Sequence, residues 1–366
     1  APTANRSDMS VTTDSSAQPQ AFAHVTAQDQ AVRVLQQALD RDRVAHAYLF
    51  EGPSGVGKQR AAVALACALL CRAARSGVRC SCSICQRVRA ENHPAVRIFR
   101  PREEGDRNLQ VELIRSQLLP FTKFAPFEGE AACVIFPEAD VSFPVHHAEA
   151  ANALLKTLEE PRAKLTFLLL SERPDRLLPT IRSRCQSVRF RALPRATLET
   201  ILAEHDVPEA VRAPAIALSQ GSADRALALA ADGLAEHMVE WVLRVDQAVA
   251  AARPGDLLDL AKELADSDQL DLLLSTLSLF YRDVAQLALG QSEGSLSFPG
   301  QRERLDARAA QVSAFEAAER VTAIAATQEA IDRNANAEIA LDSLLFGFAT
   351  GNLTPVRLLV PKPRRG

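Results

Sequence analysis

The sequence predicts an α/β fold with a parallel sheet covered by helices on both faces, followed by purely helical regions. Three observations carry this prediction. Short apolar segments alternate with helical patterns as far as about Arg191, a glycine-rich loop follows the first of these segments, and no strand-like segment follows Pro194. Such alternation is typical of parallel sheets, in which a helix crosses over between consecutive strands.

Five segments have the composition of strands that are buried on both faces, with β-branched, aromatic and leucine residues and few charges. They are Ala47–Glu51, Val96–Arg100, Ala132–Phe136, Leu165–Leu170 and Ser187–Phe190. Helical patterns separate them, among them Gln59–Arg72 and Glu149–Glu159. The predicted sheet is therefore built from these five candidate strands.

After Pro194 the pattern is helical throughout. Three short helices are expected first, followed by longer helices from His237 onward; the short ones are Arg195–Glu204, Glu209–Ser219 and Ala223–Ala231. In one longer helix, apolar residues recur at i, i+3, i+4 and i+7 from Leu270 to Val284, which places them on one stripe. One further helix is expected to carry Leu305, Ala309, Val312 and Phe315.

Length and composition argue against several classes of protein. A chain of 366 residues suggests two or three domains, and its formal net charge of −3 disfavours a globally basic nucleic-acid binder. The longest apolar run, Ala61–Cys71, has eleven residues, far fewer than the roughly 18 to 20 of a membrane span. The first 22 residues lack an apolar core and are expected to form a disordered tail. We therefore expect a cytoplasmic protein.

The glycine-rich loop is Gly52-Pro53-Ser54-Gly55-Val56-Gly57-Lys58-Gln59. It matches seven of the eight positions of the phosphate-binding template GxxxxGK[ST], between a strand and a helix as that template requires. In this motif the glycines let the backbone wrap a phosphate, the helix N-terminus offers free N–H groups, and the lysine reaches the outer phosphates. The pattern predicts a nucleotide-binding P-loop.

Two positions that hold Mg²⁺ in P-loop enzymes have lost their ligands. Gln59 replaces the Ser or Thr hydroxyl, and Pro137 follows the third strand where an Asp is usual. Glu138 keeps the place of a water-activating carboxylate, and Asp140 completes this degenerate acidic motif. Because the metal neutralises charge in phosphoryl transfer, we expect Mg²⁺ to be poorly held and the chain's own ATP hydrolysis to be lost. Binding of ATP or ADP stays open.

Four of the seven cysteines are clustered in the sequence, at Cys71, Cys80, Cys82 and Cys85. Their spacing predicts a zinc site with four thiolate ligands, which leaves no open position for chemistry and is therefore structural. The alternative is a set of reduced cysteines without metal. The remaining cysteines are expected to be buried as small apolar residues; they are Cys67, Cys133 and Cys185.

Four further motifs complete the sequence pattern. They are Ala151–Pro161 (ANALLKTLEEP), Leu178–Cys185 (LPTIRSRC), Asn92-His93-Pro94 and Asn334-Ala335-Asn336. Together with the cysteines inserted after the P-loop, these motifs resemble the bacterial clamp-loader family of the AAA+ class, and within it the delta-prime subfamily of DNA polymerase III. The resemblance covers about residues 23–350.

The resemblance implies three domains. A RecA-like AAA+ P-loop domain would span 23–191, with a zinc knuckle inserted at about 71–85. A small helical lid would follow at 192–235, and an all-α collar that oligomerises with other subunits at 236–350. Tails would precede and follow these domains, at 1–22 and 351–366. This division agrees with the change from mixed to purely helical patterns near Pro194.

The family also implies a function. Its delta-prime members are largely non-hydrolysing subunits of an open ring that loads the sliding clamp onto primed DNA, as part of the DNA polymerase holoenzyme. By resemblance, Arg184 would be an arginine finger acting in trans on the ATP site of a neighbouring subunit, and Arg225 a sensor arginine of the lid. The implied partners are the ATPase subunits of gamma/tau type and the delta subunit, and, through the assembled complex, the clamp and DNA.

Two other readings stay open at this point. One is an active P-loop ATPase, the motor subunit of the same class of loader, against which Gln59 and Pro137 argue. The other is a zinc-knuckle nucleic-acid-binding protein with an inactive NTPase domain. The aromatic content of 5% disfavours a stacking surface for single strands.

Overall fold

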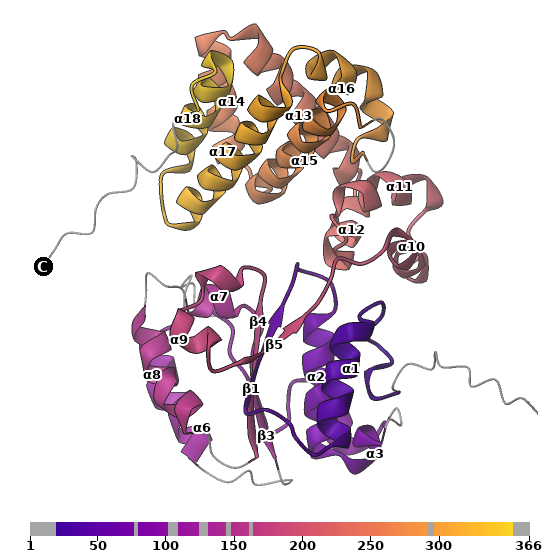
Figure 1. Cartoon of the computed structure of the whole chain (residues 1–366), viewed down its shortest axis with the longest axis vertical. Coiled ribbons are helices and arrows are strands. Elements are labelled where there is room, and N and C mark those ends of the chain that lie inside the picture. The colour runs from indigo at the N-terminus through magenta and orange to yellow at the C-terminus, as the bar shows by residue number, and fades with distance from the viewer. Residues whose placement is uncertain are drawn as a thin grey trace, which may run out of the picture. The chain divides into compact units, whose positions relative to one another are not determined.

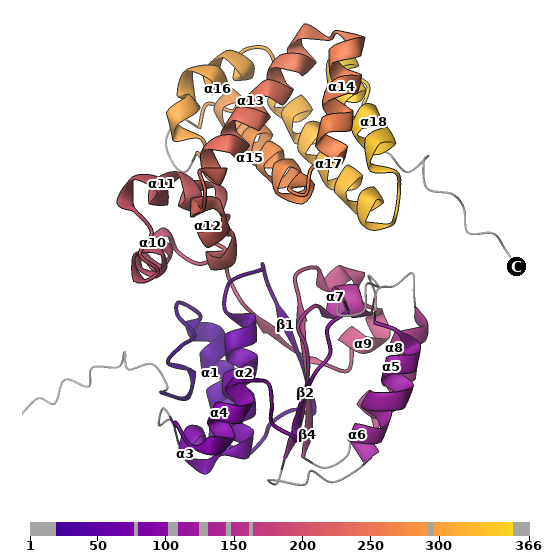
Figure 2. The same cartoon turned by 180° about the vertical axis from the view of Figure 1, so that it is seen from behind.

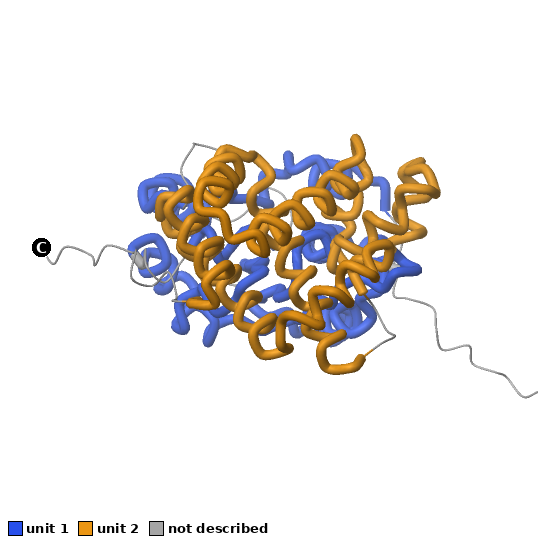
Figure 3. Tube along the Cα trace, turned by 90° about the horizontal axis from the view of Figure 1, so that it is seen from above, with its two compact units in different colours: residues 1–197 blue, residues 198–366 orange. Residues whose placement is uncertain are grey.

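The computed structural model describes residues 20–76, 80–101, 109–123, 131–143, 148–160, 164–291 and 296–353. It forms two compact units that divide after Thr197 (Figure 3). Most of the two predicted tails lies outside the described residues, and so do 77–79 of the predicted knuckle. The boundary predicted between lid and collar falls inside one helix of the second unit, and stays a prediction.

The first unit is built on the predicted parallel sheet. Its five strands lie in the order β2-β3-β4-β1-β5, and all of their pairings are parallel. They are β1 (Ala47–Glu51), β2 (Val96–Ile98), β3 (Ala132–Phe136), β4 (Leu165–Ser171) and β5 (Gln186–Arg189). Every residue of β3 and β4 is buried, as expected for central strands covered by helices on both faces. The strand prediction is confirmed. The ends of β1 and β3 are as predicted, and those of β2, β4 and β5 differ by one or two residues.

Helices cover both faces of this sheet (Figures 1 and 2). On one side lie α1 (Asp29–Asp40), α2 (Lys58–Leu70), α3 (Arg72–Arg75) and α4 (Ser83–Arg89). On the other lie α5 (Val111–Leu113), α6 (Leu119–Lys123), α7 (Ala139–Ser142), α8 (Ala148–Glu159) and α9 (Pro179–Arg182), with a π-helical turn at Ile114–Leu118 between α5 and α6. The glycine-rich loop lies between β1 and α2, as the sequence predicts for a P-loop α/β fold.

The second unit contains helices and no strand among its described residues. Three short helices come first, α10 (Arg195–Glu204), α11 (Glu209–Leu218) and α12 (Ala223–Ala230). Longer ones follow: α13 (Leu234–Ala251), α14 (Pro254–Ala265), α15 (Leu270–Ala288), α16 (Arg302–Ala309), α17 (Ala314–Asp332) and α18 (Ala337–Thr350). Buried residues of α11 and α12 belong to the same apolar core as those of the longer helices.

The single helix expected through Leu305 and Phe315 was wrong. The chain leaves α16 after Ala309, and α17 begins at Ala314, where the Ser313 hydroxyl accepts the N–H of Glu316 at 3.1 Å. Ser313 and Glu316 have the spacing of a capping box, a start signal in the sequence that the apolar periodicity had masked. As a result Val312 is buried between the two helices, while the Phe315 side chain is 74% exposed.

Asn334-Ala335-Asn336, one of the family-like motifs, has a local explanation. Asn334 has φ +67° and so ends α17 in the left-handed conformation that asparagine tolerates. Asn336 caps α18 by accepting the N–H of Ile339 at 3.0 Å. The motif therefore breaks and restarts the helix. No helix in the described part of the chain is long and apolar enough to cross a membrane.

Candidate functional site

The glycine-rich loop connects the carboxyl end of β1 to the N-terminus of α2. Gly52 has φ +150°, and a Cβ there would lie 2.3 Å from the carbonyl oxygen of Phe190. Gly57, with φ +97°, is the N-cap of α2. Since both backbone angles lie in the region that favours glycine, these two positions exclude other residues. The loop thus has the strand–loop–helix geometry that the motif predicts, at the edge of the sheet where parallel strands end.

Lys58 is the first residue of α2 and is only 7% exposed. Its ammonium donates to the carbonyl oxygens of Gly52 and Pro53. The Lys58 side chain therefore turns back over the glycine-rich loop. The same loop that would wrap around a phosphate supplies the two carbonyl oxygens that accept from the Lys58 ammonium. A phosphate ligand would have to compete with these two acceptors for the Lys58 protons.

Gln59 points away from the loop. Its side chain is exposed, and Nε2 donates to Oε1 of Glu91 at 3.4 Å. Both oxygens of Glu91 also accept from Nη2 of Arg100, at 2.7 and 2.8 Å. Gln59, which replaces the metal-binding hydroxyl, thus donates to the carboxylate of Glu91, and that carboxylate is already paired with Arg100.

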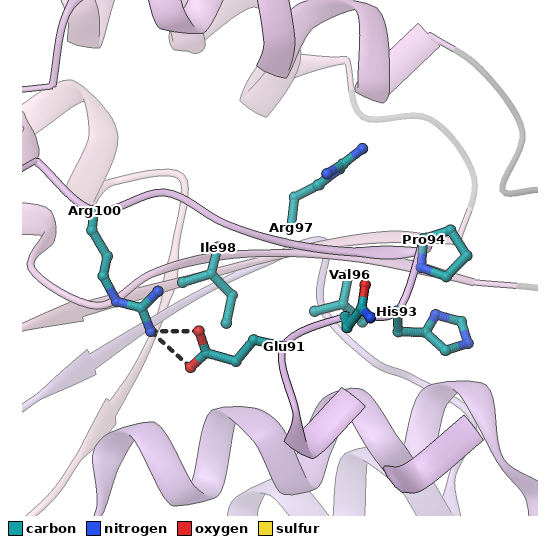
Figure 4. A pocket seen from close by; sticks show the side chains of 8 residues that line it. Glu91, His93, Pro94, Val96, Arg97, Ile98 and Arg100 are labelled. Carbon is teal, nitrogen blue, oxygen red and sulfur yellow. Dashed lines mark hydrogen bonds and ion pairs between the residues drawn. The ribbon is translucent and has the colours of Figure 1, made fainter. Parts of the chain in front are cut away.

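Glu91 and Arg100 line a cavity of about 460 Å³ beside β2, which the sequence analysis did not predict. In Figure 4 the two side chains form a pair at one end, His93 lies at the other, and Arg97 points away from both. The Arg97 guanidinium lies 5.9 Å from the centre of the Phe121 ring. Because the charged groups diverge or are paired, this cavity presents no convergent set of polar groups to a ligand.

The degenerate acidic motif lies just after β3. Phe136 is the last, fully buried residue of the strand, Pro137 follows it, and Glu138 is the N-cap residue of α7. Asp140 is 8% exposed, and its Oδ2 accepts the backbone N–H of Arg173 at 3.2 Å. Burial raises the pKa of the Asp140 carboxyl above its ordinary value. Asp140 therefore acts as a buried acceptor that ties α7 to the segment after β4.

Arg184 follows the short helix α9. Its Nη2 donates to Oε1 of Glu159, the last residue of α8, and its Nη1 donates to the carbonyl oxygen of Thr180 at 2.9 Å. The Arg184 side chain is 32% exposed. It is an anchored cation at the surface of the first unit, with part of the guanidinium accessible.

Arg225, the other arginine that the family resemblance singles out, lies in the first turn of α12 in the second unit. Its backbone N–H donates to the hydroxyl of Ser222, the N-cap residue, at 3.1 Å. Its side chain is half-buried. The sensor role predicted for Arg225 stays a prediction.

The four clustered cysteines are brought together as predicted. Cys71 ends α2, Cys82 is the N-cap of α4, and the four sulfur atoms of Cys71, Cys80, Cys82 and Cys85 all lie within 4.8 Å of one another. Cys71 Sγ is 3.7 Å from Cys80 Sγ and 3.8 Å from Cys82 Sγ. A tetrahedral Zn–S₄ centre with Zn–S bonds of about 2.3 Å needs sulfur–sulfur distances of about 3.8 Å. The cluster can therefore hold a metal ion.

The surroundings of the cluster favour a thiolate at Cys82, whereas burial raises the pKa of the Cys85 thiol. The N–H of Cys85 donates to Cys82 Sγ at 3.5 Å, and this contact lowers the pKa of Cys82 to about 6. Arg89 donates to the carbonyl oxygen of Cys80 at 2.9 Å. In the sequence, residues 52–90 contain seven basic side chains and no acidic one. Since a zinc ion with four thiolates has a net negative charge, this acid-free segment favours the loaded site.

Of the other cysteines, Cys67 and Cys133 are buried as predicted, at 4% and 0% exposure. Burial raises the pKa of both thiols, that of Cys133 to about 12. Cys185, beside Arg184, is half-buried, so only part of that prediction holds. Burial raises its pKa to about 12 as well. All three thiols are thus poor nucleophiles at neutral pH.

Comparison with known proteins shows what these features resemble. A family model described as DNA polymerase III, delta subunit, matches residues 27–194, which include the glycine-rich loop, the cysteines and Arg184. DNA polymerase III subunit delta′ of Bacillus subtilis is 27% identical over 88% of this chain and 97% of its own length. The chain is thus similar to delta-type subunits of DNA polymerase III.

Two further relatives are similar to this chain over shorter stretches. Subunit delta′ of Pseudomonas aeruginosa is 36% identical over 58% of this chain and 65% of its own length. Subunit gamma/tau of Mycobacterium tuberculosis (strain CDC 1551) is 35% identical over 50% of this chain and 31% of its own length. This chain is similar to subunits of both the delta′ and the gamma/tau type, so similarity alone does not distinguish the two types. The distinction has to come from the site residues.

Proposed function

We propose that this clamp-loader chain is a delta-prime-type subunit of DNA polymerase III that hydrolyses little or no ATP itself and donates Arg184 to the ATP site of a neighbouring subunit. The proposal rests on the loss of both metal-binding side chains from a loop whose glycine geometry is intact. Gln59 and Pro137 stand where a hydroxyl and a carboxylate would hold Mg²⁺. Subunit delta′ of Bacillus subtilis, which is similar to this chain over 97% of its own length, is a subunit of the same type.

The environment of the glycine-rich loop supports the first half of this proposal. The Gln59 amide, which has no anionic oxygen, is engaged with Glu91. Asp140, the buried carboxylate of the acidic motif, already accepts the backbone N–H of Arg173. Phosphoryl transfer without a well-held Mg²⁺ loses much of the charge neutralisation that makes it fast. The loop would then bind ATP or ADP without turning it over, or serve as structure only.

The second half rests on Arg184. An arginine finger stabilises the charge that develops on the transferring phosphoryl group and is worth about 10³ to 10⁵ in rate. Arg184 fits this role because hydrogen bonds hold its guanidinium while its side chain stays 32% exposed. A chain that has lost its own hydrolysis can therefore remain essential to that of its neighbour.

The partners and metal of this proposal follow from the family. The chain would assemble with ATPase subunits of gamma/tau type and with a delta subunit, through the helices from about residue 236 onward. The assembled loader, and not this chain alone, would act on the sliding clamp and primed DNA. Zn²⁺, held by Cys71, Cys80, Cys82 and Cys85, would stabilise the fold of the insert, and no catalytic step would pass through it.

Two measurements test the proposal. ATP hydrolysis by the purified chain in the presence of Mg²⁺ should not exceed that of the Lys58→Ala variant, which controls for contaminating ATPases. Turnover that depends on Lys58 would instead make the chain a motor subunit. In the loader reconstituted with gamma/tau-type and delta subunits, Arg184→Ala should lower turnover at the neighbouring ATP site by about 10³-fold or more, and so lower the total ATP turnover, without preventing assembly. Unchanged turnover would remove the finger role.

A further inference from the structure

We propose that Glu159 is a positioning residue for Arg184, and that its carboxylate holds the guanidinium in the orientation from which it reaches a phosphate of the neighbouring subunit. This inference rests on the proposed function of Arg184. It adds to that function a residue from a different element, since Glu159 ends α8 and Arg184 follows α9.

The contacts of Arg184 fix its guanidinium from two directions. Nη2 donates to Oε1 of Glu159, and Nη1 donates to the carbonyl oxygen of Thr180 in α9 at 2.9 Å. Nη1 also donates to the hydroxyl of Ser183 at 3.4 Å. A guanidinium has five N–H groups in a planar fork, so these three bonds leave donors for a phosphate. With the Arg184 side chain 32% exposed and that of Glu159 49% exposed, the remaining donors have access to a ligand from outside the chain.

The two elements that carry the pair are themselves held by the core. Leu154 and Leu158 of α8 and Ile181 of α9 are at most 1% exposed and belong to one apolar cluster. The backbone N–H of Arg184 donates to the carbonyl oxygen of Ile181 at 3.1 Å. Because rigid elements hold both residues of the ion pair, the pair orients the long Arg184 side chain before a phosphate binds. Arg184 then loses less rotamer freedom on binding than an unpaired arginine would.

The position of Glu159 also indicates a role outside its own helix. It is the last residue of α8, where the helix dipole disfavours a carboxylate. The cation that compensates this charge in the structure is Arg184. Replacing Glu159 by Gln therefore removes an unfavourable charge from the helix end, and the variant is expected to fold. Glu160, the next residue, is an exposed glutamate and provides a matched control.

The test is a double-mutant cycle in the reconstituted loader. ATP turnover is measured as kcat and KM for the loader with wild-type chain, Glu159→Gln, Arg184→Ala, the double variant and Glu160→Gln. Exposed ion pairs of this kind change equilibria by about two- to fivefold. We expect Glu159→Gln to lower kcat by about that factor at unchanged KM for ATP, and to have no effect once Arg184 is Ala. Glu160→Gln should match the wild type.

The outcomes separate this inference from the function on which it rests. If Arg184→Ala leaves turnover unchanged, the proposed function fails, and the inference with it. If Arg184→Ala lowers turnover but Glu159→Gln leaves kcat unchanged or raises it, only the inference is overturned, and a rise would mean that the carboxylate restrains the finger. A loss from Glu159→Gln that persists in the Arg184→Ala background would show that Glu159 acts on the fold and not through Arg184.

Discussion

Gln28 and Arg191, 163 residues apart in the chain, are joined by two hydrogen bonds through the Gln28 side chain. Its Oε1 accepts the backbone N–H of Arg191 at 2.9 Å, and its Nε2 donates to the carbonyl oxygen of Arg191 at 2.7 Å. Nε2 also donates to the carbonyl oxygen of Val56 at 3.2 Å. One buried amide, 3% exposed, therefore links the start of α1, the glycine-rich loop and the segment after β5.

Removal of this amide should destabilise the protein. Gln28→Ala would leave backbone groups of Val56 and Arg191 without their partner in a partly buried site. We expect a loss of about 1–3 kcal/mol in the free energy of unfolding, the usual cost of an unsatisfied buried polar group. Urea unfolding followed by circular dichroism measures it. Gln37→Ala, at an exposed position of the same helix, is the control and should change little. Equal effects of the two substitutions would contradict the structural role of Gln28.

The parts of the fold that the sequence predicted are those set by local pattern. Central strands of a parallel sheet must be apolar on both faces, so β3 was recognised with its exact ends and β4 to within one residue. β5 is an edge strand in which only Val188 is buried, and its predicted ends are off by one residue. In the second unit, periodicity located the helices but ran across the break between α16 and α17.

For the candidate site, too, the sequence predicts the features that are set by local pattern and not the others. The glycine-rich loop and the four cysteines could be predicted because their chemistry is encoded in short spacings. The partners of the key side chains could not, since they come from distant segments: Gln59 meets Glu91, Arg184 meets Glu159, and Gln28 meets Arg191. Only the folded chain brings these residues together, and a single sequence contains no pattern that pairs them.

The cysteine cluster predicts a measurable metal dependence. The purified chain should contain one zinc ion per molecule, and Cys82→Ser should lower this content because a hydroxyl is a poor zinc ligand. Ser81→Ala, at an exposed position in the same turn, is the matched control and should keep the metal. Chelation should lower the melting temperature by more than about 5 °C, since each 1 kcal/mol is worth about 2–4 °C in a domain of this size. A metal-free chain with an unchanged melting curve would contradict a structural zinc site.

Asp140 predicts a dependence of stability on pH. Burial raises the pKa of its carboxyl, so the folded chain binds this proton more tightly than the unfolded chain, whose value is about 3.9. The stability from this group is fully present below about pH 4 and is lost as the pH rises through the folded value. Relative to Asp140→Asn, the wild type should therefore lose unfolding free energy as the pH rises above about 4. Asp175→Asn, at an exposed position, is the control, and parallel pH curves for wild type and Asp140→Asn would contradict the prediction.

The core of the second unit contains a polar network that crosses its helices. Asp246 of α13 accepts from the Tyr281 hydroxyl at 3.2 Å and from Arg308 Nη2 at 2.7 Å, and Arg320 Nη1 donates to the same Tyr281 oxygen at 3.1 Å. The side chains of Asp246 and Arg308 are only 14% and 12% exposed. Burial raises the pKa of Tyr281, which keeps its hydroxyl protonated as the donor to Asp246.

Breaking this network should cost far more than breaking a surface pair. Asp246→Ala leaves Arg308 without its carboxylate in a mostly closed site, and loss of one partner of a buried pair costs about 3–5 kcal/mol. Glu263→Ala removes the carboxylate of the exposed Arg244–Glu263 pair, whose side chains are 56% and 46% exposed, and should cost less than about 1 kcal/mol. Thermal unfolding of the two variants compares them directly. If Asp246→Ala is as mild as Glu263→Ala, the helices of this unit are held by their apolar core alone, and the buried ions contribute nothing to its stability.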